Sequence, residues 1–419
     1  MKPLFKAGLA VALTFAARAQ DVPGAPQDNG LTPITDTIYL NVPDTDTINN
    51  GSVESLGVGV TADEFVIVGW EDDGDDTLTD LEAVWTLRNR EGAGLTPETT
   101  IRSIADPGAG TTTSRFLSYF RSDESATPPS TAWGPKIKVN LFGDGMGMGA
   151  TAFSLGGEVP ELEEINRDDS DGGVGDFPGV QLLDATGAPT SIATGANDAD
   201  AQPAGDIRIA DWEFLANGKV VIVGENRQEQ DLVDRFGGDT PNRHAVYRIV
   251  GPDGSEVKAF SLLSATTDPV EMWHGVGATK DGWAARFSLN GRATIRLFDN
   301  QGEPTSGNID IGELTGVEAT SGGGRGDSTG FHGNGTDAYV VINSGPAPED
   351  VGEGQNVPWL TVVNADGSHR YTRVASDDFE FANSARVDAA IDPIGRVVAV
   401  WADSDATLGQ FRLVEGRVF

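Results

Sequence analysis

Two of the four histidines in this sequence have neighbours that could share proton-transfer chemistry with them. His244 follows Arg243 and precedes Tyr247, and His274 follows Trp273. Elimination from an acidic polysaccharide needs a base for the C5 proton, an acid for the leaving oxygen and a cation beside the uronate. The catalytic candidates are therefore His244, Tyr247, His274 and Arg243. The simpler interpretation is that they are ordinary residues at strand ends and in loops.

Two acidic loops offer the hard oxygen ligands that Ca²⁺ prefers, six to eight at flexible geometry. The candidate metal ligands are Asp72, Asp73, Asp75, Asp76, Asp168, Asp169 and Asp171. The alternative is that both loops are solvated hairpins of an acidic chain. Ca²⁺ is the one cofactor indicated. A nucleotide or redox cofactor is not predicted, because the glycine-rich stretch 143–149 lacks the Lys and Ser/Thr of a phosphate loop.

A Gly-x-Ser-x-Gly match occurs at 326–330. A serine nucleophile of this type needs a buried strand before it and a helix after it. The flanks 321–324 and 331–335 are rich in glycine and indicate flexible loop on both sides. The pattern therefore argues against a serine hydrolase.

Aromatic side chains are the candidate binding groups, because exposed rings stack on sugars and anchor protein interfaces. Of the eight tryptophans, four lie in strand-like runs and are predicted to pack in the core: Trp70, Trp85, Trp283 and Trp401. The four nearer to loops are the ligand-binding candidates: Trp133, Trp212, Trp273 and Trp359.

The composition excludes several partners. The 419 residues include 64 acids against 29 bases, a formal net charge of −35, and no cysteine. Such a surface would repel nucleic acid and anionic membranes. The absence of cysteine leaves stability to the core, with no disulfide framework.

The N-terminus predicts export. Residues 1–19 have a basic start, a short apolar stretch and a small-x-small cleavage site, which is the pattern of a signal peptide. Residues 20–33 are predicted to be a flexible leader, and 34–419 a single domain with a long insertion around 106–176. No segment of the mature chain is long and apolar enough to span a membrane as a helix. We expect a secreted, cell-surface or periplasmic protein.

A weak repeat organises the elements that would position these residues. A short apolar run is followed, after a polar loop, by a second run that ends in a turn closed by glycine. The runs are 65–68 with 85–87, 180–183, 220–223 with 247–250, 283–287 with 295–298, 339–342 with 360–363, and 397–401 with 411–414. The closing glycines are separated by 48 to 95 residues. The shorter separations match the ~40–50 residues of a propeller blade. Although 79–88 could also begin a helix, its place in the repeat predicts a strand at 82–87.

These repeated runs resemble the divergent β-propeller repeats of secreted bacterial proteins. The resemblance covers most of 57–419 and implies an all-β propeller with six blades, or alternatively seven. The final copy is short and 37–42 is a free strand, which favours a ring closed by the N-terminal strand. A β-sandwich array is the competing architecture.

Three functions fit this sequence. The first is a non-catalytic propeller that binds an extracellular glycan or protein through loops at one end of the ring. The second is a polysaccharide lyase or glycoside hydrolase on the same scaffold. The third is a structural surface protein shaped by calcium, whose melting temperature would fall when a chelator removes the metal.

Overall fold

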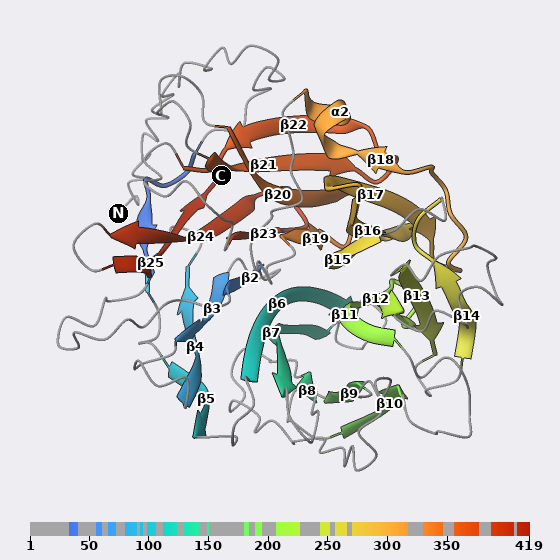
Figure 1. Cartoon of the computed structure of the whole chain (residues 1–419), viewed down its shortest axis with the longest axis horizontal. Helices are drawn as coiled ribbons and strands as arrows, with labels where there is room; N and C mark the ends of the chain where they lie inside the picture. The colour runs from blue at the N-terminus through green and yellow to red at the C-terminus, as the bar shows by residue number, and fades with distance from the viewer. Residues whose placement is uncertain are drawn as a thin grey trace, which may run out of the picture.

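Over the residues that it describes, the computed structural model is built of β-strands with one short helix. It describes residues 33–40, 56–60, 66–72, 80–89, 93–94, 99–105, 112–123, 130–141, 149–150, 180–183, 189–194, 207–226, 244–251, 256–265, 270–316, 330–346, 356–376, 387–405 and 409–419. Within these residues the strands form five four-stranded sheets and two smaller ones, arranged around a common centre (Figure 1).

The sheets follow one another along the chain. The first contains β2 (Leu56–Val60), β3 (Val66–Asp72), β4 (Asp80–Arg88) and β5 (Thr99–Ala105). The two smaller sheets contain β6 (Thr112–Asp123), β7 (Ser130–Leu141), β8 (Gly149–Ala150), β9 (Val180–Leu183) and β10 (Pro189–Thr194). The next contains β11 (Ile207–Phe214), β12 (Val220–Asn226), β13 (His244–Val250) and β14 (Glu256–Leu262).

Three sheets complete the chain. One has β15 (Val270–Ala278), β16 (Gly282–Leu289), β17 (Arg292–Asp299) and β18 (Ile309–Asp310), followed by α2 (Ile311–Thr315). The next has β19 (Phe331–Gly333), β20 (Ala338–Pro346), β21 (Asn356–Asn364) and β22 (His369–Val374). The last has β23 (Val387–Ile391), β24 (Val397–Asp405), β25 (Gly409–Val418) and, from the other end of the chain, β1 (Ile38–Tyr39).

Each four-stranded sheet is an antiparallel meander whose strands occur in chain order, apart from β1 at the outer edge of the last sheet. The first strands β2, β11, β15, β19 and β23 lie nearest the centre in Figure 1. In the last sheet, Ile38 pairs with Gly416 and Tyr39 with Glu415. An N-terminal strand therefore pairs with the C-terminal strand, as the sequence predicted.

The short turns of neighbouring sheets lie together at one end of the strands, which we call the turn face: 215–219, 279–282, 299–303, 334–338, 364–368 and 392–396. Hydrogen bonds join them in series. These are Asn217 Nδ2 to Asn300 O, Asn300 Nδ2 to Lys280 O, Lys280 N to Thr336 O, Ala365 N to Asp337 O, and Thr336 Oγ1 to Pro393 O. Four consecutive sheets are thereby tied together at this face.

Two of the closing glycines explain why the repeat requires glycine. Gly302 and Gly367 have φ angles of +83° and +85°, which side chains rarely adopt. A Cβ at Gly302 would also lie 2.8 Å from Ile249 Cδ1 of the preceding sheet, and one at Gly367 would lie 2.8 Å from Ile309 Cδ1. Each turn therefore docks on the sheet before it.

The remaining connections start from the opposite ends of the strands, which we call the loop face. In an antiparallel meander, the turn between the second and third strands and the link to the next sheet lie opposite the other two turns. Only the Asn290–Gly291 turn is short among those described there, and both residues have positive φ, as a two-residue hairpin requires. Described strands also end at this face where the chain leads into 73–79, 106–111, 227–243, 266–269, 317–329, 347–355, 377–386 and 406–408.

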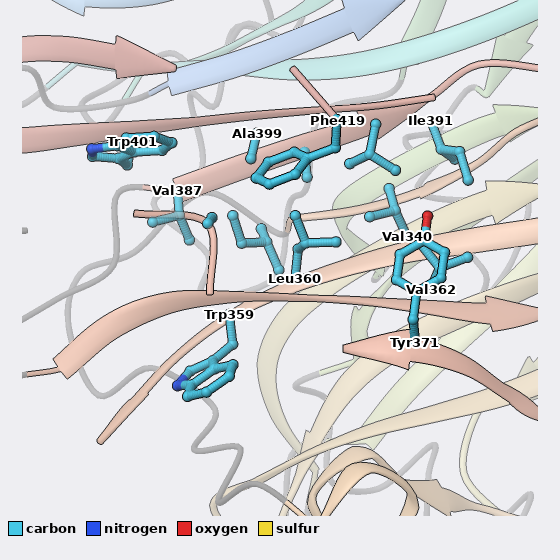
Figure 2. Packing of buried hydrophobic residues seen from close by; sticks show 14 of the residues in the cluster. Val340, Trp359, Leu360, Val362, Tyr371, Val387, Ile391, Ala399, Trp401 and Phe419 are labelled. Carbon is cyan, nitrogen blue, oxygen red and sulfur yellow. The ribbon is translucent and has the colours of Figure 1, made fainter. Parts of the chain in front are cut away.

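The core lies between adjacent sheets. Figure 2 shows Leu360 and Val362 of β21 facing Val387 and Ile391 of β23, with Trp401 and Phe419 in the same cluster, whereas Trp359 projects from the other side of β21. Trp401 and Trp283 are fully buried, which confirms their predicted packing role. Burial of side chains of this size provides a large part of the stability, about 1.5–3 kcal/mol for each large apolar group.

The repeated apolar runs are the second and third strands of the sheets. For example, 220–223 and 247–250 pair in register as β12 and β13. The strand β4 (Asp80–Arg88) includes the predicted strand 82–87, so these residues do not form a helix. In contrast, the expectation of loop on both sides of 326–330 is wrong on one side, because Phe331–Gly333 forms β19. Pairing with β20 decides this, although glycine lowers the intrinsic strand propensity.

The segment 106–176, predicted as an insertion, contains the paired strands β6 and β7 and the two-residue strand β8. The predicted signal peptide and leader precede the described residues, apart from Pro33. Among the described helices, no segment has the length and apolar character to cross a membrane.

Candidate functional site at the inner strands

A buried histidine and a buried aspartate meet between two innermost strands. His332 lies on β19 and Asp388 on β23, and His332 Nε2 is 3.0 Å from Asp388 Oδ1. Their side chains are 7% and 3% exposed. A carboxylate that accepts a hydrogen bond from an imidazole holds the ring in one orientation, which is the arrangement of an acid–base group and its orienting partner.

Asp388 is held by three donors. Its Oδ1 also accepts from Ala389 N at 2.9 Å, and its Oδ2 accepts from Val58 N at 2.9 Å. Val58 belongs to β2, so one carboxylate bridges the first, penultimate and last four-stranded sheets. Because charged acceptors form the stronger hydrogen bonds, these contacts fix the carboxylate firmly.

A buried arginine extends the group to a fourth sheet. Arg286 lies on β16 and its Nη2 donates to Asn343 Oδ1 of β20 at 2.9 Å. Arg286 and Asn343 are 6% and 4% exposed. Burial lowers the pKa of Arg286 to about 10, and the negative charge of Asp388 opposes that shift. The guanidinium thus remains a cation at neutral pH.

This group, which we call the axial group, comprises Arg286, His332, Asn343 and Asp388. It combines an imidazole, a carboxylate and a cation on neighbouring sheets near the centre of the ring. Unpaired buried charges are costly, so such groups persist where they are paired. Here the pairs cross from sheet to sheet, which gives the group both a structural and a potential chemical role.

The sequence candidates around His244 are only partly described. His244 is the first residue of β13, opposite Asn226, so it begins at the loop face. Arg243 lies outside the described residues. Tyr247 is 2% exposed, and its hydroxyl donates to Gly302 O at 2.6 Å. Burial raises the pKa of Tyr247, and its ring packs 5.0 Å from those of Trp283 and Phe298. The structure gives Tyr247 a packing role, and its part in catalysis stays a prediction.

Trp273 and His274 lie on the innermost strand β15, where the pairing with β16 is irregular. The register shifts between Glu271 and Gly275. A bulge of this kind changes the direction in which neighbouring side chains project and is common beside functional sites. Gly275, at the end of the bulge, pairs with Arg286. The backbone of His274 is therefore next to the residue of β15 that pairs with Arg286 of β16.

The other tryptophan candidates have different settings. Trp133 lies on β7 opposite Phe120, and Trp212 lies on β11 opposite Ile222. Trp359 is 4% exposed and belongs to the core cluster of Figure 2. Its ring therefore fills the interior in the structure, while ligand contacts by Trp133, Trp212 and Trp273 stay predictions.

The predicted calcium ligands fall almost entirely outside the described residues. Asp72 ends β3 at the loop face. The others are Asp73, Asp75, Asp76, Asp168, Asp169 and Asp171. Across the part of the chain that the structure describes, no cluster of three or more His, Asp or Glu side chains could hold a metal ion. Calcium binding by the two loops stays a prediction.

Sequence reasoning missed the axial group because its members are scattered over more than a hundred residues. His332 lies between Phe331 and Gly333 in a glycine-rich stretch, and Asp388 is one acid among many. One signal was available: Asp388 interrupts the apolar run Val387–Ile391, and a charge in a buried strand calls for a partner.

Comparison with family models and with curated proteins found no match. Solved structures gave distant likenesses. A Dyadobacter fermentans protein of unknown function aligns over 95% of this chain and 99% of its own, with 10% identity and a TM-score of 0.48. An α-L-arabinofuranosidase of Fusarium graminearum aligns over 91% and 97%, with 10% identity and a TM-score of 0.46. The NanB sialidase of Streptococcus pneumoniae aligns over 91% and 70%, with 9% identity and a TM-score of 0.46. Likeness at this level carries no function to this chain.

Proposed function

We propose that this protein is an exported six-bladed β-propeller that degrades an extracellular polysaccharide. The reaction would take place near the propeller axis, on the side of the loop face. The observation that carries the proposal is the contact of His332 with Asp388. An oriented, buried imidazole lies on the strand that directly follows the connection 317–329, and its partner lies on the strand that follows 377–386.

The blade count is part of the proposal. β6 contacts both β2 and β11, the innermost strands of the sheets before and after it. It therefore has the position of an innermost strand, and β7 together with the small sheet of β8, β9 and β10 would complete the second blade. Five four-stranded sheets and this blade make six, and the pairing of β1 with β25 would close the ring.

The axial group favours elimination from a uronate-containing polysaccharide. His332 would transfer the proton, Asp388 would orient the imidazole, and Arg286 would supply positive potential toward the uronate. Hydrolysis would instead need two carboxylates at a fixed separation. Glu213, 3% exposed on the innermost strand β11, is a second buried acid near the centre. The products distinguish the two reactions.

The test is incubation of the purified protein with charged and neutral polysaccharides, with the size of the products measured. Elimination leaves an ultraviolet-absorbing double bond at each new non-reducing end, whereas hydrolysis leaves new ends without a double bond. His332→Gln should lower the rate by about 10²–10⁴-fold, the usual contribution of a proton-transferring group. His369→Gln is the matched control, because His369 lies on the outermost strand β22 and contacts Thr372. Equal rates for both variants would remove His332 from the mechanism.

The second candidate is a non-catalytic glycan-binding propeller. It is favoured by the complete engagement of Asp388, whose three donors suit a structural link between sheets. Polysaccharides that stay intact throughout, with the protein retained on one immobilised glycan, would establish this function instead.

A further inference from the structure

We propose that Asp388 is a positioning residue that closes the inner rim of the ring and, through the same carboxylate, orients His332. The functional pair would then be assembled only when the first sheet docks on the last. The second half of this inference rests on the proposed function, whereas the first half concerns the fold alone.

The inner contact joins parts of the chain that are far apart in sequence. Val58 N donates to Asp388 Oδ2 across 330 residues. β2 is the edge strand of its sheet, and an edge strand leaves alternate N–H groups without a neighbouring strand. Val58 is 1% exposed, so water does not replace this partner. The carboxylate of Asp388 takes the place of a further strand.

An outer contact closes the same junction independently. β1 pairs with β25, Leu40 N donates to Val414 O, and Arg88 Nη2 donates to Leu40 O at 2.8 Å. Between the two rims lies a separate apolar cluster in which Val58 packs with Leu40, Ala390 and Val400. The junction therefore has a backbone seam outside, apolar packing between and one carboxylate inside.

Of the two contacts, the inner one between Val58 and Asp388 involves a residue of the axial group. Asp388 Oδ2 accepts from Val58 N while Oδ1 contacts His332, so separation of β2 from β23 would remove one of the donors that hold the carboxylate beside the imidazole. An oligosaccharide bound against His332 would favour the closed junction by the same linkage. The orientation of His332 and the closure of the junction between β2 and β23 would therefore both depend on the carboxylate of Asp388.

Hydrogen exchange by mass spectrometry on the full chain tests closure without any assay of activity. Asp388→Asn keeps the size of the side chain but removes the charge and one acceptor. We expect amide exchange in β2 to accelerate about tenfold or more, while β20 and β21 keep their protection. Asp392→Asn is the matched control, because Asp392 is equally buried and its described hydrogen bonds join it to Arg396 and Ile394 within the β23–β24 turn.

A second variant removes the donor instead of the acceptor. Val58→Pro deletes the N–H that Asp388 accepts and replaces the valine side chain by an apolar ring, and proline is tolerated on edge strands. It should accelerate β2 exchange as Asp388→Asn does. Unchanged exchange in β2 in both variants would overturn the proposed closure. Accelerated exchange with undiminished polysaccharide cleavage would overturn the orienting role alone. His332→Gln should leave β2 exchange unchanged, so loss of cleavage in that variant reports on the proposed function and not on closure.

Discussion

A Cβ on Gly277 would lie 2.2 Å from the backbone nitrogen of Gly333, so the innermost strands β15 and β19 touch backbone to backbone. The reciprocal approach is as close, because a Cβ on Gly333 would lie within 2.5 Å of two backbone atoms of Ala278. Gly335 N also donates to Ala278 O at 3.0 Å. Only glycine allows strands to converge this far, and the convergence brings His332, next to Gly333, up to the neighbouring sheet.

Gly277→Ala should therefore destabilise the protein. The atoms in its way are backbone atoms and cannot rotate aside, so we expect a loss at or above the upper end of the ~1–3 kcal/mol typical of overpacking. Urea unfolding measures it. Gly307→Ala is the control, because nothing lies within 4 Å of its Cβ and its φ is ordinary. Equal stability of the two variants would contradict the close approach.

The docking of turns on the preceding sheet gives a second prediction. Gly302 and Gly395 both have positive φ, but only at Gly302 would a Cβ meet a neighbour, Ile249 Cδ1. Alanine at either position should cost about 1–2 kcal/mol of backbone strain. Gly302→Ala should cost more, by an amount near the lower end of the ~1–3 kcal/mol typical of overpacking, because Ile249 Cδ1 is the end of a side chain. The difference between their urea midpoints isolates docking, and a difference of zero would mean that these turns do not support the neighbouring sheet.

A substitution of Tyr247 can distinguish a packing role of this residue from a catalytic one. Tyr247→Phe keeps the ring against Trp283 and removes the hydroxyl that donates to Gly302 O. We expect a loss of about 0.5–1.5 kcal/mol of stability, the usual net value of a hydrogen bond. Polysaccharide cleavage should be unchanged. A large fall in the cleavage rate with normal stability would instead restore Tyr247 as an acid or base of the reaction.

Much of the architecture could be predicted, because the second and third strands of each sheet are continuous apolar runs. Val220–Val223 and Val397–Val400 are buried on both faces, and such runs are visible in a sequence. The innermost strands could not be predicted as readily. β19 is Phe-His-Gly, and its glycine serves close approach rather than a turn. The axial group could not be predicted, because no local sequence pattern links Arg286 to Asp388. These residues lie on different sheets, and only the packing of the sheets brings them together.

The free energy of unfolding should depend on pH through Asp337, a residue of the turn face. Hydrogen bonds from Asn334 Nδ2 and Arg370 Nη2 to Asp337 lower the pKa of that carboxyl. Since the pKa is lower in the folded state, the stabilisation is present above the unfolded value of about 3.9 and is lost as the pH falls through the folded value. Asp337→Asn should flatten the decline of the unfolding midpoint below about pH 4. An acid limb identical to that of the original protein would show that Asp337 contributes nothing.

The dependence of kcat/KM on ionic strength should show whether the proposed polysaccharide substrate is charged. The chain carries a formal net charge of −35, so its long-range field repels a polyuronate and leaves a neutral polysaccharide unaffected. Added salt shortens the Debye length to about 10 Å at 0.1 M and weakens that repulsion. If the substrate is a uronate polymer, kcat/KM should rise with salt while kcat changes little, because salt acts on the encounter and not on the buried contacts of Arg286, His332 and Asp388. A neutral salt of a monovalent cation is required, so that divalent bridging does not imitate screening. A kcat/KM that is independent of salt would identify an uncharged substrate, and Arg286 would then serve only to link its sheet to the next.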